Sequence, residues 1–186
     1  MTKLFSTLAN YNIHFTDKEK LLLQNELQYV KIEKDEFILK EGEVNSEVFF
    51  LNYGSFYQYA VDHNQDVNVI DLYTENDWML NHKSFTTRKP SKYAIQACEE
   101  SFVYKLSIDS IHKLIAISQE FFKMGKLLDQ AVSRIEFYDN NNSPDEKYVH
   151  LLENKPIVIR KFPQKVIASY LKITPETLSR VRKRIS

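Results

Sequence analysis

Apolar residues near the N-terminus follow a helical spacing behind a capping signal. Thr16 precedes Glu19 by three residues, the arrangement in which a threonine and an acid cap the first turn of a helix. The apolar residues that follow are Leu21, Leu22, Leu23 and Leu27. This pattern predicts a short helix that begins at Thr16.

From about Tyr29 to Ser107 the pattern changes to short runs rich in Val, Ile, Phe and Tyr, separated by polar breaks. Gly42 and Gly54 lie in two of these breaks and mark turns. The predicted strands are Tyr29–Ile32, Glu36–Leu39, Glu47–Asn52, Phe56–Val61, Val67–Tyr73, Lys92–Ala97 and Phe102–Leu106. Short strands about ten residues apart, with no helix between them, predict an antiparallel barrel, roll or sandwich.

A proline-free stretch from Gln119 to Asp139 predicts a long helix. Its apolar residues recur in alternating steps of three and four, at Phe121, Met124, Leu128, Ala131, Ile135 and Tyr138. This heptad spacing favours a two-helix dimer seam, and a helix packed on its own β-domain is the alternative. The polar residues from Asp139 to Pro144 end the helix and predict a hinge.

Beyond the hinge, the sequence predicts short helices. Ser143 and Pro144 suit the start of a helix over 145–152, and Ile157-Val158-Ile159 reads as a short β-type run. A helix over 164–171 follows Pro163, and a tight turn at Lys172-Ile173 leads to a last helix that begins at Thr174-Pro175-Glu176. Apolar residues frame these last two helices, namely Val166, Ile167, Ala168, Leu171, Ile173, Leu178, Val181 and Ile185.

The zero net charge of the chain hides an asymmetry. Residues 155–186 carry nine basic side chains against the single acid Glu176, a net charge of +8, so the first 154 residues carry −8. A localised basic segment points to nucleic acid as a partner, whereas charge alone fits a solvated face equally well.

Two short helices across a tight turn, the second one basic, predict a helix-turn-helix. Arginine can read guanine, glutamate can accept from cytosine, and threonine can contact a thymine methyl group. We therefore assign base contacts to residues near the start of the last helix, namely Glu176, Thr177, Ser179 and Arg180. Phosphate contacts are assigned to Lys172, Thr174, Arg182, Lys183 and Arg184. An ordinary helical hairpin with a basic end is the alternative.

The order of these elements, together with the string from Ile167 to Arg180 (IASYLKITPETLSR), resembles the CRP/FNR family of bacterial transcription regulators. The resemblance covers essentially the whole chain and implies an α+β fold. This comprises an N-terminal antiparallel β-roll (a double-stranded β-helix of the cyclic-nucleotide-binding type) over residues 1–116, a dimerisation helix and hinge over 117–143, and a helix-turn-helix over 144–186. It further implies a homodimer on an inverted-repeat operator in double-stranded DNA, with RNA polymerase as a further partner.

The chain departs from the family pattern in three places. Lys172 stands where the family often has glycine, so a lysine would adopt a left-handed conformation. The chain ends just after the last helix, without a wing. The family's Gly-Glu pair and phosphate-binding arginine are also missing, with Ser91 in the arginine position. We therefore expect no cyclic nucleotide, and the candidate effector pocket is formed by Trp78, His82, Arg88, Ser91, Lys92 and Tyr93.

Composition excludes several other classes of protein. One cysteine, Cys98, cannot form an intrachain disulfide or hold an iron–sulfur cluster, and three scattered glycines exclude phosphate-binding loops. The five histidines are not spaced as metal ligands, so we expect neither metal nor cofactor. No apolar run approaches the ~18 residues of a membrane span, so a cytoplasmic protein without a membrane partner is expected.

Two other functions remain open. Asp71, Glu75, Asp77 and His82 could suggest acid–base catalysis, but no nucleophile or carboxylate pair accompanies them, so an enzyme is not expected. A ligand-binding or protein-interaction module that keeps the scaffold without reading DNA is the main alternative.

Overall fold

The computed structural model describes residues 1–185, except for the side chains of residues 129–131, 133 and 134. The chain begins with two helices, α1 (Thr2–Asn10) and α2 (Asp17–Glu26). Thr16 caps α2 as predicted, because its hydroxyl accepts from the Glu19 N–H while the Glu19 carboxylate accepts from the Thr16 N–H at 2.9 Å. The helix α1 was not predicted; it buries Leu4 and Leu8 against the β-domain.

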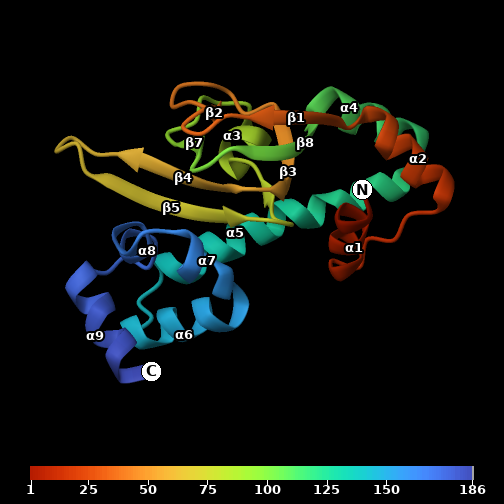
Figure 1. Cartoon of the computed structure of the whole chain (residues 1–186). Helices are drawn as coiled ribbons and strands as arrows, with labels where there is room; N and C mark the ends of the chain where they lie inside the picture. The colour runs from red at the N-terminus through yellow and green to blue at the C-terminus, as the bar shows by residue number, and fades with distance from the viewer. Residues whose placement is uncertain (186) are drawn as a thin grey trace.

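Two antiparallel four-stranded sheets form a β-roll, with strand orders β1-β8-β3-β6 and β2-β7-β4-β5 (Figure 1). All seven predicted runs are strands, and the two-residue β6 was missed. The bounds are β1 (Gln28–Ile32), β2 (Phe37–Leu39), β3 (Glu47–Tyr53), β4 (Ser55–Val61), β5 (Val67–Thr74), β6 (Trp78–Met79), β7 (Ala94–Ala97) and β8 (Ser101–Ser107). Residues from both sheets form one apolar cluster, which includes Leu51, Phe56, Tyr73, Met79 and Ile95.

The predicted long helix is divided into two parts. After α3 (His82–Thr87) and α4 (Ile108–Ile117), the chain forms the 3₁₀ helix η1 (Gln119–Gly125) and then α5 (Lys126–Asp139). In a 3₁₀ helix, side chains three residues apart lie on the same side. Phe121 and Met124 are therefore both buried, while Phe122 between them is 64% exposed. The rings of Phe121 and Phe15 pack with their centroids 4.7 Å apart, which ties η1 to the N-terminal segment.

Four helices complete the chain, α6 (Pro144–Asn154), α7 (Pro156–Lys161), α8 (Gln164–Tyr170) and α9 (Pro175–Ile185). Ser143 caps α6 with Pro144 in its first turn, as predicted. The predicted β-type run Ile157-Val158-Ile159 is wrong, because these residues lie in α7. Pro156 starts that helix, and burial of Val158 beside Phe162 outweighs the β-propensity of the run.

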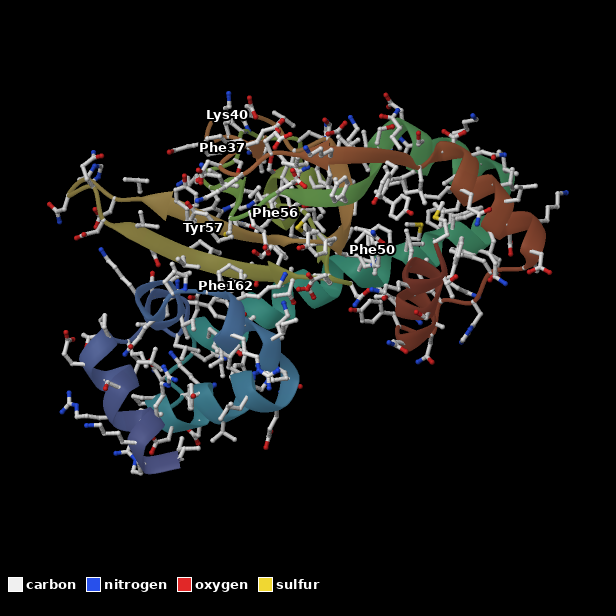
Figure 2. The ribbon with its side chains drawn as sticks, in the orientation of Figure 1. Phe37, Lys40, Phe50, Phe56, Tyr57 and Phe162 are labelled. Atoms are coloured by element: carbon white, nitrogen blue, oxygen red, sulfur yellow. The ribbon has the colours of Figure 1, made fainter. Side chains whose placement is uncertain are left out.

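The C-terminal helices and the β-roll share one apolar cluster. Val69 and Leu72 of β5 belong to it, together with Tyr148, Phe162, Ile167, Tyr170, Leu171, Leu178 and Val181. Figure 1 shows α7 and α8 lying along β5, and Figure 2 shows Phe162 between that strand and the helices. The orientation of α6–α9 is therefore tied to the roll as well as to α5.

Two glycines with positive φ allow a stability test of the turns. Gly54 has φ +113°, and a Cβ atom there would lie 2.0 Å from Ser101 Oγ and 2.9 Å from Ser101 Cα. Gly42 has φ +86°, and a Cβ atom there would meet nothing within 4 Å. Gly42→Ala should cost about 1–3 kcal/mol from backbone strain alone. Gly54→Ala should lower the free energy of unfolding by more, because overlap with Ser101 is added. If urea denaturation gives equal losses of unfolding free energy for the two variants, the overlap with Ser101 adds nothing and this prediction is wrong.

Candidate nucleic-acid interface

The helices α8 and α9 pack as the apolar frame predicted. Ala168 of α8 and both Leu178 and Val181 of α9 are each 1% exposed. Lys172 in the intervening turn has φ +58°, so a lysine does adopt the left-handed conformation there. Thr174 caps α9, since its hydroxyl accepts from the Thr177 N–H at 3.2 Å. The two helices therefore form a fixed pair with one outward face.

The outward face of α9 carries the predicted base-reading side chains. Glu176 and Arg180 are exposed, while Thr177 and Ser179 are half-buried. The Arg180 guanidinium lies 3.5 Å from the Thr177 hydroxyl. The pKa of Glu176 lies below its ordinary value because its own N–H and the Thr174 hydroxyl donate to the carboxylate. Glu176 is thus a charged acceptor beside an arginine donor.

Two side chains of α8 join this face, and the sequence analysis missed them. Gln164 and Lys165 line a shallow concavity of about 500 Å³ together with Pro175, Glu176, Ser179 and Arg180. The Gln164 amide donates to the Pro175 carbonyl at 3.1 Å, which joins the starts of the two helices. Arg182 and Lys183 line an adjoining concavity. The position of Gln164 and Lys165 directly after Pro163, where the helix starts, was the available signal.

The residues predicted to contact phosphates lie in two places, along α9 and in the turn before it. Arg182, Lys183 and Arg184 are exposed along α9, and the guanidinium of Arg184 pairs with Asp145 of α6. The Thr174 hydroxyl is used in the cap of α9.

Lys172 requires a correction, because its ammonium group is directed toward β5. It donates to Asn68 Oδ1 at 2.9 Å and to the Val69 carbonyl at 2.8 Å. Burial lowers the pKa of Lys172, in keeping with a side chain withdrawn from solvent. This conformation does not offer Lys172 to a phosphate.

The predicted dimer stripe also requires a correction. Phe121, Met124 and Tyr138 are buried within the chain, Leu128 and Ile135 are half-buried, and the side chain of Ala131 lies outside the described residues. Tyr138 packs on Tyr170 of α8 with ring centroids 4.4 Å apart. The alternative of a helix packed on its own chain therefore holds for these three residues.

A different apolar surface is open at the same place. Phe122 is 64% exposed and Ile117 is 52% exposed. Phe122 also lines an apolar groove of about 200 Å³ between α4, η1 and α5, whose walls include Ile111, Ile115 and Leu128.

The predicted effector residues are only partly brought together. Ser91, Lys92 and Tyr93 line a cavity of about 290 Å³ beside α3, with Lys83 and Lys89 as further cations that the sequence analysis missed. Arg88 donates to the Asn45 carbonyl at 2.6 Å, and His82 lies half-buried on α3. Trp78 packs on Phe50 in the core, and its indole N–H has no hydrogen-bond partner among the described residues. The assignment of Trp78 to the effector pocket is therefore wrong, because Trp78 lies in the core and does not line this cavity.

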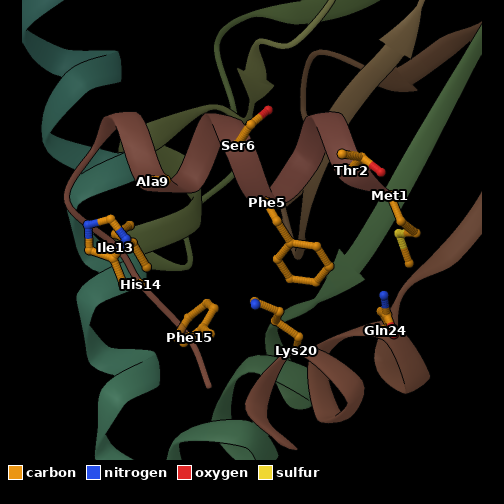
Figure 3. Close-up of a pocket in the computed structure, with 10 residues that line it drawn as sticks. All are labelled: Met1, Thr2, Phe5, Ser6, Ala9, Ile13, His14, Phe15, Lys20 and Gln24. Atoms are coloured by element: carbon orange, nitrogen blue, oxygen red, sulfur yellow. The ribbon is translucent and has the colours of Figure 1, made fainter. Parts of the chain in front are cut away.

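A further pocket lies between α1 and α2 (Figure 3). It has a volume of about 480 Å³, an apolar lining that includes Phe5, Ile13 and Phe15, and the polar groups of His14, Lys20 and Gln24. Figure 3 shows the Lys20 side chain between the Phe5 and Phe15 rings. Since Phe15 also packs on Phe121, one wall of this pocket rests on η1.

Other chemistry is limited within the described residues. They contain no group of three or more His, Cys, Asp or Glu side chains that could hold a metal ion. Burial raises the pKa of the Cys98 thiol to about 12, which leaves it protonated at neutral pH. None of the helices in residues 1–185 has both the length and the apolar character needed to cross a membrane.

Comparisons with known proteins agree with this architecture. Residues 29–118 match the family described as Cyclic nucleotide-binding domain. FixK2 from Bradyrhizobium japonicum is 17% identical, with a TM-score of 0.71 over 86% of this chain and 84% of that chain. A CooA mutant from Carboxydothermus hydrogenoformans is 14% identical, with a TM-score of 0.65 over 98% of this chain and 83% of that chain.

A third similar structure is a putative transcriptional regulator of the CRP/FNR family from Eubacterium rectale. It is 15% identical, with a TM-score of 0.58 over 96% of this chain and 85% of that chain. The sequence has no significant match among curated proteins. At these low identities the structural likeness establishes the fold. Residues 29–118 are thus similar to the cyclic nucleotide-binding domain family, and the chain as a whole shares its fold with solved structures that include CRP/FNR-type regulators.

Proposed function

We propose that the protein is a transcription regulator that binds an inverted repeat in double-stranded DNA as a homodimer. The observation that carries this proposal is the outward face of α9, where the acceptor Glu176 and the donor Arg180 stand beside Lys165 and Lys183. Such a face combines base-edge chemistry with positive charge for phosphates. RNA polymerase is the further partner that control of transcription implies.

The surface charge supports DNA more strongly than the net charge does. Lys165, Arg180 and Lys183 are exposed on α8 and α9. Figure 2 shows nitrogen-tipped side chains projecting from α9 away from the sheets. An ordinary helical hairpin has no need to collect cations around two adjoining concavities, one of which an acid also lines.

A second copy of this chain is the partner that we propose for the groove beside Phe122. The groove is lined by apolar side chains of α4, η1 and α5, and the exposed Phe122 and Ile117 extend its apolar surface. The solved structures with this fold include CRP/FNR-type regulators, and the symmetry of an inverted repeat requires a two-fold dimer. The seam is thus proposed at η1 and the first part of α5, centred on Phe122, with Leu128 of the heptad stripe among the residues that line the groove.

Cyclic AMP and similar nucleotides are not the effector in this proposal. Phe56, Tyr73 and Met79 pack in the apolar cluster between the two sheets, and the buried Tyr73 hydroxyl donates to Gln58 Oε1 at 2.9 Å. The Ser91 hydroxyl is engaged within its own loop, bonding the Tyr93 carbonyl at 2.7 Å. The roll interior is thus filled by the protein's own side chains, and the phosphate-binding arginine of the family is replaced.

Selection of duplexes from a random DNA pool by the ligand-free protein tests the proposal directly. Recovery of an inverted repeat is the expected result. If only salt-sensitive, sequence-blind binding is recovered, the protein in this state does not read DNA. An interaction module on the same scaffold then becomes the better description.

Arg180→Ala and Lys183→Ala separate base reading from phosphate binding. Arg180→Ala should cost about 1–3 kcal/mol at one base position in each half-site and leave random DNA binding nearly unchanged. Lys183→Ala should weaken all sequences alike and reduce the slope of log K against log salt by about 0.9 for each lysine lost. Fluorescence anisotropy on selected and scrambled duplexes measures both.

The control is Lys34→Ala, which removes an exposed lysine from the loop between β1 and β2. It should leave both the affinity and the salt slope unchanged. Identical behaviour of Arg180→Ala and Lys183→Ala on the two duplexes would show that the assignment of base reading is wrong.

Phe122→Glu tests the proposed seam. Burial of one phenylalanine contributes about 1.5–3 kcal/mol, and a dimer buries two, so the dissociation constant of the dimer should rise by more than about 100-fold. Sedimentation equilibrium measures it. Val61→Glu, which alters a 42% exposed residue at the end of β4, should leave the dimer intact. A monomeric wild-type protein, or an unaffected Phe122→Glu dimer, would rule out this seam.

A further inference from the structure

The strand β5 is the outer strand of its sheet, so one row of its backbone polar groups has no partner strand. Side chains of α8 and the turn that follows it bond to this row. The Val69 N–H donates to Ser169 Oγ at 2.9 Å, and Ser169 Oγ donates to the Val67 carbonyl at 3.2 Å. Lys172 Nζ donates to the Val69 carbonyl at 2.8 Å. The edge is thus covered by helix side chains in place of a further strand.

The other end of β5 is held by two more lysines of the C-terminal segment. Lys155 Nζ donates to the Leu72 carbonyl at 2.9 Å and pairs with Asp77 Oδ2 at 2.7 Å. The side chains of Lys155 and Asp77 are only 14% and 15% exposed, so solvent screens this pair less than a surface ion pair.

Lys161 is the second of these lysines, and its ammonium group contacts three oxygen atoms. Its Nζ donates to Glu75 Oε1 at 2.5 Å, to Glu99 Oε1 at 2.9 Å and to the Gly54 carbonyl at 3.0 Å. Burial alone would lower the pKa of Lys161, but the two carboxylates outweigh it and raise the pKa above its ordinary value. The ammonium group therefore stays charged and joins α7 to the turns at one end of the β4–β5 pair, where Ser55 pairs with Thr74.

These side chains, Lys155, Lys161, Ser169 and Lys172, are named the β5 contact. Lys172 also faces Asp139 Oδ1 at 3.7 Å, so it touches the last residue of α5 as well as β5. The reading helix α9 packs on α6 and α8, whereas α7 and α8 are the helices that meet β5. Through α8, the β5 contact therefore fixes the direction of α9 relative to α5.

We infer that the β5 contact positions the reading helix and thereby sets the spacing of the two half-sites that the dimer accepts. This inference rests on the proposed function. Without the contact, α6–α9 would be held on β5 by the apolar cluster and on α5 by the packing of Tyr138 on Tyr170, and apolar packing is non-directional, so it permits several directions of α9. The lysines of the contact act through α7 and α8 and do not touch DNA in this proposal, although they belong to the same basic segment.

The test compares Lys161→Met/Lys172→Met, which removes two ammonium groups, with the conservative variant Lys161→Arg. Lys165→Met is the matched control, since Lys165 is an exposed lysine on α8 within the proposed DNA face. Unchanged near-ultraviolet circular dichroism and a cooperative melt would show that each variant is folded.

Hydrogen exchange of β5 amides, followed by mass spectrometry without DNA, is the first measurement. In the double Met variant, the amide hydrogens of peptides that contain Val69 should exchange at least about tenfold faster than in the wild type. The exchange rates of peptides from β3 and β8 should be unchanged. Lys161→Arg and Lys165→Met should exchange as the wild type does. Unchanged exchange of β5 in the double variant would overturn the inference.

Binding to selected operators whose half-sites are moved apart or together by one and two base pairs is the second measurement. The wild type should bind one spacing more tightly than the others. In the double variant, this ratio of affinities should fall by at least about tenfold, and the slope of log K against log salt should be unchanged. Lys165→Met should keep the spacing preference and reduce the slope of log K against log salt. A retained preference, or a reduced slope in the double variant, would overturn the positioning role.

The two measurements also separate this inference from the proposed function. If the wild type selects no DNA, the proposed function fails and the positioning role falls with it. The exchange measurement then still decides whether the lysines hold α8 on β5.

Discussion

The unpartnered edge of β5 is the constraint that shapes the second half of this chain. An outer strand exposes backbone N–H and C=O groups that either pair with another chain or must be covered. Here α7 and α8 cover it, with Val69 and Leu72 packed in the same apolar cluster as Phe162 and Leu171. One requirement of the roll, to protect an edge, thus fixes where the C-terminal helices lie and which face of α9 remains open.

Local signals in the sequence predicted much of this architecture. Capping residues act over three or four positions, so Thr16 and Ser143 marked the starts of their helices correctly. The positive φ of Lys172 was expected from the family resemblance, because the family often has glycine at this position. The strands were visible because half-buried β-structure selects the same branched and aromatic residues wherever it occurs.

Features that depend on distant residues could not be predicted in this way. The η1 segment has the same apolar spacing as α5, but it is wound as a 3₁₀ helix whose Phe121 packs on the distant Phe15. The run Ile157–Ile159 has β-propensity, and only the apolar cluster around Val158 favours α7. The partners of Lys161 and Lys172 lie far away in the sequence, at Glu75 and Asn68, so no local pattern distinguishes these lysines from those that face solvent.

The charge asymmetry of the chain consequently serves two purposes. Asp77, Glu75 and Glu99 of the negative half neutralise Lys155 and Lys161 of the positive half within the folded chain. A count of basic residues therefore overstates the positive charge that DNA would meet. The same count does not reveal the ion pairs within the chain that we infer direct α9. Because ion pairs with little exposure weaken less with salt than surface charges do, orientation of the reading helix and attraction to phosphates respond differently to ionic strength. If the chain binds DNA as proposed, α9 would thus keep its direction at salt concentrations at which nonspecific binding to DNA is already lost.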